Sequence, residues 1–106
     1  MRETTFLILT ALADRPRHGY GIVQEVSVLS GGRVALLPGT LYTALDRLTA
    51  QGLVELSGEE VVDGRLRRYY RLCADGRAEL ARQSERLRRL ASAADSRLKT
   101  LRPDPA

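Results

Sequence analysis

The sequence predicts a mainly α-helical protein with a small β-hairpin, arranged as a winged helix-turn-helix that is followed by a long C-terminal helix. Three observations lead to this fold class. Three helix-length segments precede two strand-like stretches, Asp63-Gly64 between those stretches is a strong hairpin-turn dipeptide, and apolar residues then recur every seven positions. With 106 residues and 43% apolar content, the chain can build one core but not two.

The first two expected helices lie before residue 30. FLILTALA, residues 6–13, is apolar on every side, and such a helix is normally covered from two directions. One cover is its own core; the second is a partner chain, for which Phe6 and Leu7 are candidate contacts. Pro16 breaks this helix. A second helix is expected over residues 18–29, with Ile22, Val26 and Leu29 inward, and Gly31-Gly32 ends it.

The apolar run over residues 34–37 predicts a short strand. A third helix then begins at Pro38, whose missing N–H is harmless in a first turn, and ends near Gln51-Gly52. Leu41, Leu45 and Leu48 follow the spacing of one buried helical face. Two strands are expected next, LVELSG from residue 53 and RLRRYYRL from residue 65.

The third helix has an unusual outer face. At about 100° per residue Tyr42 points away from the buried leucines, toward water. The outer arc is small, hydroxyl-rich and partly basic: Gly39, Tyr42, Thr43 and Asp46, flanked by Thr40 and Arg47. This composition suits a helix in a DNA groove, where hydroxyl groups and Arg47 donate to phosphate oxygens and Thr43 touches a base edge. The alternative is that the Tyr42 ring packs on the neighbouring hairpin.

The second strand of the hairpin is strongly basic. Alternation places Tyr70 and Leu72 on the core face, and Arg65 and Arg67 on the other face beside the turn. At the tip of a wing, guanidinium groups can grip phosphate or enter a minor groove. The alternative is a basic strand that is simply solvated.

The last long segment predicts a dimerisation helix over residues 74–102, after a winged helix-turn-helix domain over residues 1–73 and before a disordered tail at 103–106. Its apolar residues form one stripe on the helix: Leu80, Leu87, Leu90, Ala91, Ala94, Leu98 and Leu101. A membrane-surface helix is the alternative, but the polar face carries acidic residues and the apolar face has no aromatic residue. A homodimer seam fits better.

Charge and composition limit the function. The net charge is +4 and the pI about 9.8, and residues 65–102 hold twelve basic against four acidic residues, which favours double-stranded DNA as partner. The single histidine and single cysteine are far apart, so we expect no zinc site, no cofactor and no enzyme. Without a leader or an apolar run long enough to span a bilayer, we expect a cytoplasmic protein that does not bind membranes.

Three sequence blocks resemble those of PadR-like transcriptional regulators and occur in the same order. They are TTFLILTALADRPRHGYGIVQEV, PGTLYTALDRLTAQGLV and DGRLRRYYRLCADGRAEL, and the resemblance covers essentially the whole chain. The resemblance implies a repressor that is homodimeric through its C-terminal helix with help from the first, and is often released from its operator by a small-molecule effector. The single helix after the wing resembles the smaller subfamily.

The resemblance also implies roles for particular residues. It places Thr40 and Tyr42 at DNA-contacting positions, Arg65 and Arg67 in the wing, and the HGY block at the start of the second helix. From that start we expect packing and one phosphate contact, for which Tyr20 is the candidate.

Two residues depart from the family pattern. Asp46 stands where a basic or neutral residue is usual; its carboxylate repels phosphate but can accept from a cytosine amino group. Cys73 replaces a capping threonine, which weakens the cap of the last helix by about 1 kcal/mol. A redox role for Cys73 is the less favoured interpretation.

The composition also bears on the effector and on a rival function. Some relatives stack flat aromatic compounds at the dimer interface, whereas this chain has no tryptophan and its C-terminal helix has no aromatic residue, so stacking-based capture is doubtful. The rival function is a winged-helix module for protein interaction that does not bind DNA.

Overall fold

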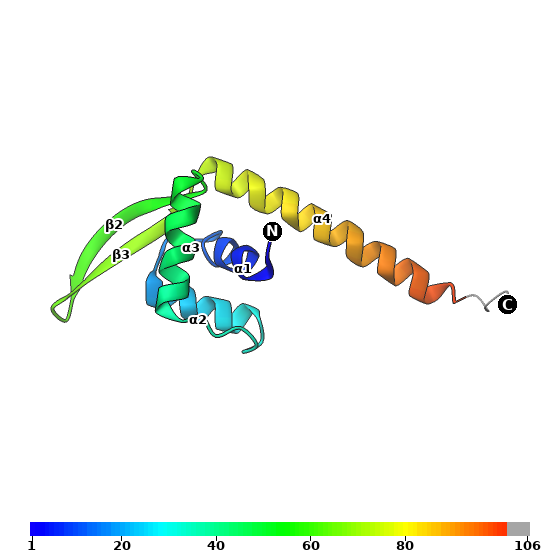
Figure 1. Ribbon diagram of the computed structural model, residues 1–106, viewed down its shortest axis with the longest axis horizontal. Coiled ribbons are helices and arrows are strands. Elements are labelled where there is room, and N and C mark those ends of the chain that lie inside the picture. The colour runs from blue at the N-terminus through cyan, green and yellow to red at the C-terminus, as the bar shows by residue number, and fades with distance from the viewer. Residues whose placement is uncertain (102–106) are drawn as a thin grey trace.

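The computed structural model describes residues 1–101 and has the predicted architecture (Figure 1). Its elements in chain order are α1 (Glu3–Ala11), β1 (Arg17–His18), α2 (Gly19–Leu29), α3 (Pro38–Ala50), β2 (Val54–Val62), β3 (Arg65–Leu72) and α4 (Ala74–Lys99). The prediction of a winged helix-turn-helix with a long C-terminal helix is confirmed. The expected tail at 103–106, and residue 102 of the expected last helix, lie outside the described residues.

The three strands form one antiparallel sheet in the order β1-β3-β2. The long β2–β3 hairpin, hereafter the wing, turns at Asp63-Gly64 as predicted. Both turn residues have positive φ, 52° and 75°, which matches the right-handed twist of a tight hairpin. A bulge between Leu56 and Gly58 interrupts the pairing of the wing strands.

The prediction of a strand over residues 34–37 was wrong, and the third strand lies elsewhere. Arg17 and His18 pair with Tyr70 and Tyr69, so β1 occupies the free edge of β3. Residues 34–37 have no strand to pair with and instead connect α2 to α3. In that connection Leu36 is buried and Val34 is partly buried against the core, whereas Leu37 is exposed.

The core lies where α1, α2 and α3 meet the start of the wing. Ile8, Leu9, Ile22, Leu41 and Leu45 are at most 1% exposed. The predicted inward residues of α3 are all buried, which confirms the face assigned to that helix.

Two predictions about the first helices need correction. The first helix begins at Glu3 rather than residue 6, and Leu7 is a core residue that is only 8% exposed. Leu29 was expected to point inward but is 43% exposed, because α2 ends at this residue and the chain turns away.

The start of α4 is fixed tightly to the domain. The Cys73 N–H donates to the Leu53 carbonyl oxygen (2.9 Å), and Gly76 packs so closely on that carbonyl that a Cβ there would overlap it. Leu80 packs against the core. Beyond this point α4 projects from the domain, which gives the molecule extents of 68 × 28 × 21 Å (Figure 1).

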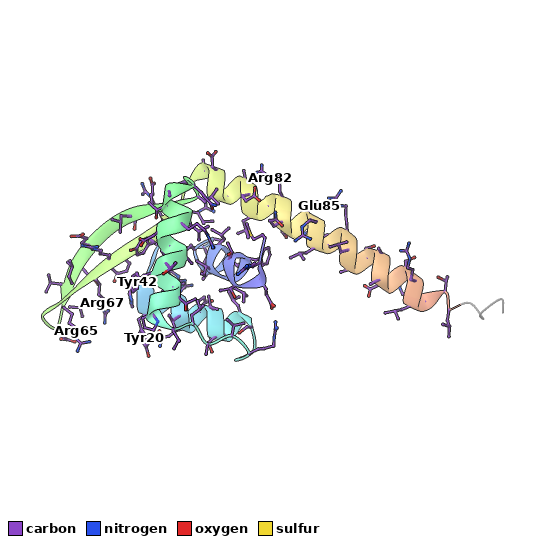
Figure 2. The ribbon with its side chains drawn as sticks, in the orientation of Figure 1. Tyr20, Tyr42, Arg65, Arg67, Arg82 and Glu85 are labelled. Atoms are coloured by element: carbon purple, nitrogen blue, oxygen red, sulfur yellow. The ribbon has the colours of Figure 1, made fainter. Side chains whose placement is uncertain are left out.

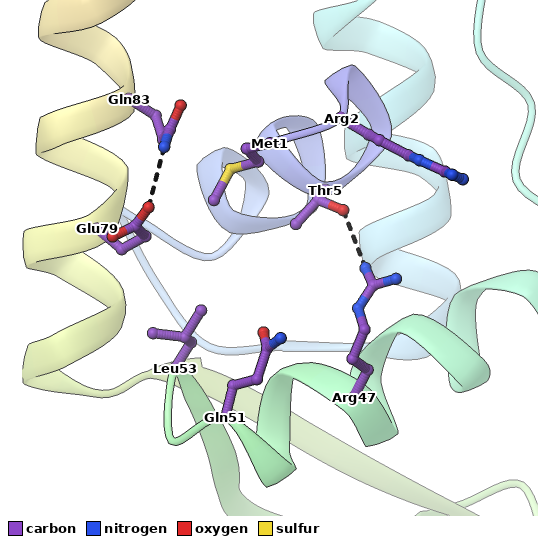
Figure 3. A pocket seen from close by; sticks show the side chains of 8 residues that line it. All are labelled: Met1, Arg2, Thr5, Arg47, Gln51, Leu53, Glu79 and Gln83. Atoms are coloured by element: carbon purple, nitrogen blue, oxygen red, sulfur yellow. Dashed lines mark hydrogen bonds between the residues drawn. The ribbon is translucent and has the colours of Figure 1, made fainter.

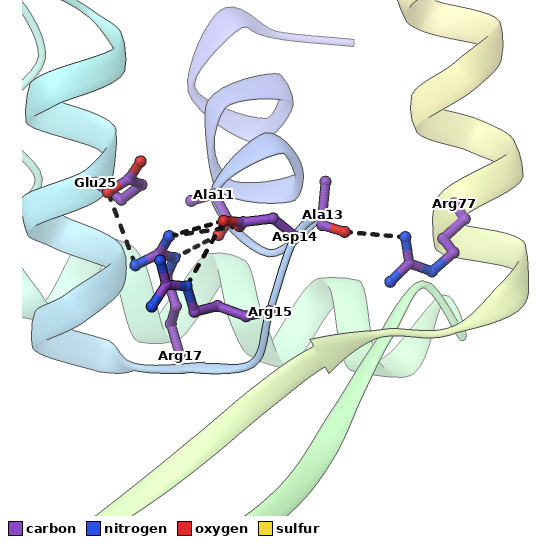
Figure 4. Close-up of polar contacts among 7 residues, drawn as sticks. All are labelled: Ala11, Ala13, Asp14, Arg15, Arg17, Glu25 and Arg77. Atoms are coloured by element: carbon purple, nitrogen blue, oxygen red, sulfur yellow. Dashed lines mark hydrogen bonds and ion pairs between the residues drawn. The ribbon is translucent and has the colours of Figure 1, made fainter.

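Polar contacts hold the segment between α1 and α2 in place (Figure 4). Arg17 donates to the Ala11 carbonyl oxygen (2.7 Å) and makes ion pairs with Asp14 and Glu25. From the other side, Arg77 of α4 donates to the Ala13 carbonyl oxygen. Within residues 1–101, no helix has both the length and the apolar character needed to cross a bilayer.

Candidate nucleic-acid interface

The exposed face of α3 carries all the residues that the sequence assigned to it. Pro38 begins the helix, and burial of its leucines on the core turns the opposite face outward. The residues of that opposite face are all exposed: Gly39, Thr40, Tyr42, Thr43, Asp46 and Arg47. This face is therefore free to meet a partner.

Tyr42 is 46% exposed, and its ring rests on the start of α2. A Cβ added at Gly19 would overlap the Tyr42 hydroxyl and lie 3.0 Å from Cζ. The ring thus lies flush against the first residue of α2, and only glycine leaves room for it. Sequence reasoning missed this role of Gly19; a glycine at the start of a helix in the HGY block was the available clue.

The other two residues of the HGY block have different roles. His18 is the N-cap of α2, where its Nδ1 accepts from the Gly21 N–H (3.3 Å). Its ring also meets the Tyr69 ring edge-on, with centroids 5.4 Å apart. Burial and the nearby Arg67 guanidinium lower the pKa of His18. Tyr20 is 67% exposed beside this cap, so it is available for contact.

The wing pairs an acidic strand with a basic one. Glu59 and Glu55 of β2 form ion pairs with Arg68 (3.5 Å) and Arg71 (2.8 Å) of β3. The Tyr69 hydroxyl donates to Glu60 (2.6 Å), which raises the pKa of Tyr69. These ion pairs offset part of the positive charge of β3. The sequence of β3 alone did not indicate that its arginines are paired.

Arg65 and Arg67 differ from the other wing arginines because neither forms an ion pair within the described part of the chain. Both lie on β3 beside the turn, as predicted. Figure 2 shows them on the same side of the molecule as Tyr20 and Tyr42, whereas Arg82 and Glu85 lie apart on α4. The fold thus brings together α3, the start of α2 and the tip of the wing.

Arg47 is an exception among the α3 residues. Its guanidinium turns toward α1 and donates to the Thr5 hydroxyl oxygen (3.0 Å), away from the wing.

The residues assigned to a dimer seam fall into two groups. On α4, Leu87, Leu90 and Leu98 are 41%, 57% and 79% exposed, and Ala91 and Ala94 are exposed beside them. Phe6 and Leu80 are half-buried within the chain, and Leu7 belongs to its core. An apolar stripe on α4 therefore remains uncovered.

A metal site and a reactive cysteine are the other kinds of site to consider in the part of the chain that the structure describes. No three His, Cys, Asp or Glu side chains there group as metal ligands. Burial and the nearby Glu55 raise the pKa of the Cys73 thiol, the opposite of what a reactive thiolate requires.

Comparison with known proteins identifies the family. The sequence model described as the transcriptional regulator PadR-like family matches residues 8–82. The chain belongs to the PadR-like family of transcriptional regulators. This PadR-like chain is also 48% identical over 84 residues to the transcriptional regulator Rv3488 of Mycobacterium tuberculosis, covering 79% of this chain and 75% of the relative.

Solved structures share the PadR-like fold. A PadR family transcription regulator from Clostridium difficile superimposes with a TM-score of 0.76 at 24% identity, over 92% of this chain and 99% of that one. Bacillus subtilis PadR, solved in complex with operator DNA, gives 0.67 at 20% identity, over 99% of this chain and 52% of that one. At these identities the likeness concerns the fold. The relatives are regulators, which confirms that this chain is not an enzyme.

Proposed function

We propose that the chain is a homodimeric repressor that binds a pseudo-palindromic DNA operator and is released by a small-molecule effector. The observation that carries the DNA-binding part is the exposed face of α3 together with two wing arginines, the exposed Arg65 and the half-buried Arg67, which form no ion pair within residues 1–101. The Bacillus subtilis relative of the same fold, solved with operator DNA, supports this assignment.

The proposed contacts divide into two kinds. Arg65 and Arg67 bind phosphates, or enter the minor groove, and the Tyr20, Thr40 and Tyr42 hydroxyls donate to phosphate oxygens. These contacts fix the register of the protein on the duplex but carry no sequence information. Base reading falls to Thr43 and Asp46, with Gly39 allowing close approach; the Asp46 carboxylate accepts from a cytosine amino group.

The proposed dimer uses the uncovered stripe of α4. A helix of 26 residues that projects from its domain with exposed leucines needs a partner to bury them. A second copy supplies an identical stripe under two-fold symmetry. Phe6 of α1 lines a hollow together with Leu87 of α4 and adds to this seam, which begins at Leu80, where α4 packs against the core.

Dimerisation sets the form of the operator. Two α3 helices related by two-fold symmetry bind half-sites about one helical turn apart, and each wing contacts flanking phosphates. A regulator that binds an operator in this way would act in the cytoplasm. The effector would bind without aromatic stacking on α4, because that helix has no aromatic residue.

Selection of bound fragments from genomic DNA, followed by salt titration of the best fragment, tests the proposal. A palindrome should be recovered, and log affinity should fall against log salt with a slope of about −0.9 per neutralised phosphate. Weak, salt-insensitive retention of DNA would favour the rival, a winged-helix module for protein interaction.

A further inference from the structure

A second polar surface borders α3 on the side opposite the wing. In Figure 1, α1 and the wing lie on opposite sides of α3. A groove of about 430 Å³ runs between the first turn of α1 and α3, hereafter the α1–α3 groove. Its polar lining consists of two arginines and four threonines: Arg2, Arg47, Thr4, Thr5, Thr40 and Thr43.

The positive charge of this groove is not neutralised within the chain that the structure describes. Arg47 donates to the uncharged Thr5 hydroxyl (3.0 Å), and neither Arg47 nor Arg2 forms an ion pair there. The carboxylate of Glu3 is engaged by Arg33.

A second carboxylate on this side of the molecule, that of Glu79, is also engaged. Figure 3 shows the pocket next to the groove, with Glu79 and Gln83 on one side of it and Arg2 and Arg47 on the other. Glu79 is hydrogen-bonded to Gln83 (3.0 Å) and paired with Arg82 (2.6 Å). Two guanidinium groups and several hydroxyls therefore line the groove, and no carboxylate is among its lining residues.

The size and place of the groove indicate its occupant. At about 430 Å³ the groove is far larger than one small ion requires. Gly39 and Thr43 line the groove and also belong to the exposed face of α3. A duplex lying on α3 therefore passes along the groove, where guanidinium and hydroxyl donors match phosphate oxygens.

We infer that the α1–α3 groove binds the sugar-phosphate backbone of the DNA, with Arg2 and Arg47 as phosphate ligands. Thr5 is a positioning residue that holds the Arg47 guanidinium at the groove. The inference rests on the proposed DNA binding and adds the first turn of α1 to the interface. α3 is then flanked by phosphate contacts on both sides, from the wing on one and from α1 on the other.

The salt dependence of duplex binding tests this inference. Arg2→Gln and Arg47→Gln should each reduce the steepness of the log–log slope by about 0.9, and the double variant by about 1.8. Arg89→Gln removes the same charge from the exposed surface of α4 and should leave the slope unchanged. Thermal unfolding of each variant shows that the domain is intact.

The outcomes separate this inference from the proposed function. If the unchanged protein binds duplex without salt dependence, both are overturned. If it binds with a steep slope that Arg2→Gln does not alter, only the α1–α3 groove is excluded. Self-association that depends on Arg2 would assign the groove to the dimer, and saturable Arg2-dependent binding of inorganic pyrophosphate would make it a small-anion site; either result overturns the inference.

Discussion

The Tyr42 ring of α3 lies directly on Gly19, the first residue of α2, with no room for a side chain between them. This contact explains why a half-exposed tyrosine can hold one orientation at the surface. The hydroxyl end of the ring is supported by Gly19, while nearly half of the side chain stays exposed. A side chain held in one orientation before binding loses less conformational freedom on binding than a mobile one does.

Gly19→Ala tests this support. The added methyl group displaces the end of the Tyr42 ring, so we expect operator affinity to fall about tenfold, the equivalent of about 1.4 kcal/mol. Stability should change by less than about 1 kcal/mol, because alanine also favours the helix and the tyrosine can swing into solvent. Fluorescence anisotropy with the selected operator measures the first effect, and denaturant unfolding measures the second.

A double variant serves as the control. If Gly19 acts through Tyr42, the affinity of Gly19→Ala/Tyr42→Ala should equal that of Tyr42→Ala alone. Additive losses would mean that Gly19 contributes independently of the tyrosine. Equal loss of folding and binding in Tyr42→Ala would mean that Tyr42 is a core residue.

Gly39→Ala should separate stability from binding. A Cβ at Gly39 meets nothing within 4 Å, and replacing a helical glycine by alanine stabilises a helix by about 0.5–1 kcal/mol. The same methyl group projects from the face proposed to approach DNA, so affinity should fall while the melting temperature rises. Ser92→Ala on α4 is the control, with a small gain in stability and unchanged affinity. Unchanged affinity in Gly39→Ala would place the DNA away from the start of α3.

Most of this architecture could be predicted from the sequence, because most of its helices and turns have signals within their own residues. The proline at the start of α3, the Asp63-Gly64 turn and the leucine spacing of α3 need no knowledge of the rest of the chain. β1 was missed because two residues, Arg17 and His18, are a strand only through pairing with β3. Long-range contacts of this kind leave no periodic pattern.

The candidate site divides in the same way. Exposure of the α3 face followed from helical periodicity, whereas the contact of Tyr42 with Gly19 depends on how α2 and α3 cross. The ion pairs of the wing depend on register, which the bulge near Gly58 shifts by one residue. For that reason the sequence could not separate the paired arginines of β3 from Arg65 and Arg67.

His18 should make the stability of the domain sensitive to pH. To cap α2, the Nδ1 atom of His18 must be unprotonated so that it can accept from the Gly21 N–H. Burial and the Arg67 guanidinium lower the pKa of His18 from 6.5 in the folded protein, and Glu60 acts in the opposite direction. Because the unfolded chain binds the proton more tightly, this stabilisation is complete above pH 6.5 and is lost as the pH falls toward the folded-state pKa.

His18→Asn is the matched comparison for this pH dependence. Asparagine can accept the same backbone hydrogen bond at an N-cap but does not titrate. Melting temperatures measured on either side of pH 6.5 should therefore fall more in the unchanged protein than in His18→Asn. Parallel curves for the two proteins would show that His18 does not contribute.

Cys73→Thr should stabilise α4. Cys73 has the extended backbone of an N-cap but makes no side-chain capping hydrogen bond. A threonine hydroxyl there can accept from a free N–H of the first turn, which adds about 0.5–1 kcal/mol to the free energy of unfolding. Denaturant unfolding measures the gain, with Cys73→Ala as the control that removes the thiol without supplying a cap. Equal stability of the two variants would show that the first turn of α4 gains nothing from a cap.

Leu90→Glu should convert the proposed dimer to monomer. Leu90 lies in the exposed apolar stripe of α4, and two-fold symmetry places two copies of it in the seam. Losing burial of two leucines at about 1.5–3 kcal/mol each weakens association by about 10²- to 10⁴-fold. Sedimentation velocity across a concentration series measures the shift, and Arg89→Gln on the opposite face of the helix should remain dimeric. A Leu90→Glu protein that stays dimeric would move the seam off this stripe, since an unpaired carboxylate buried between two apolar helices is not tolerated.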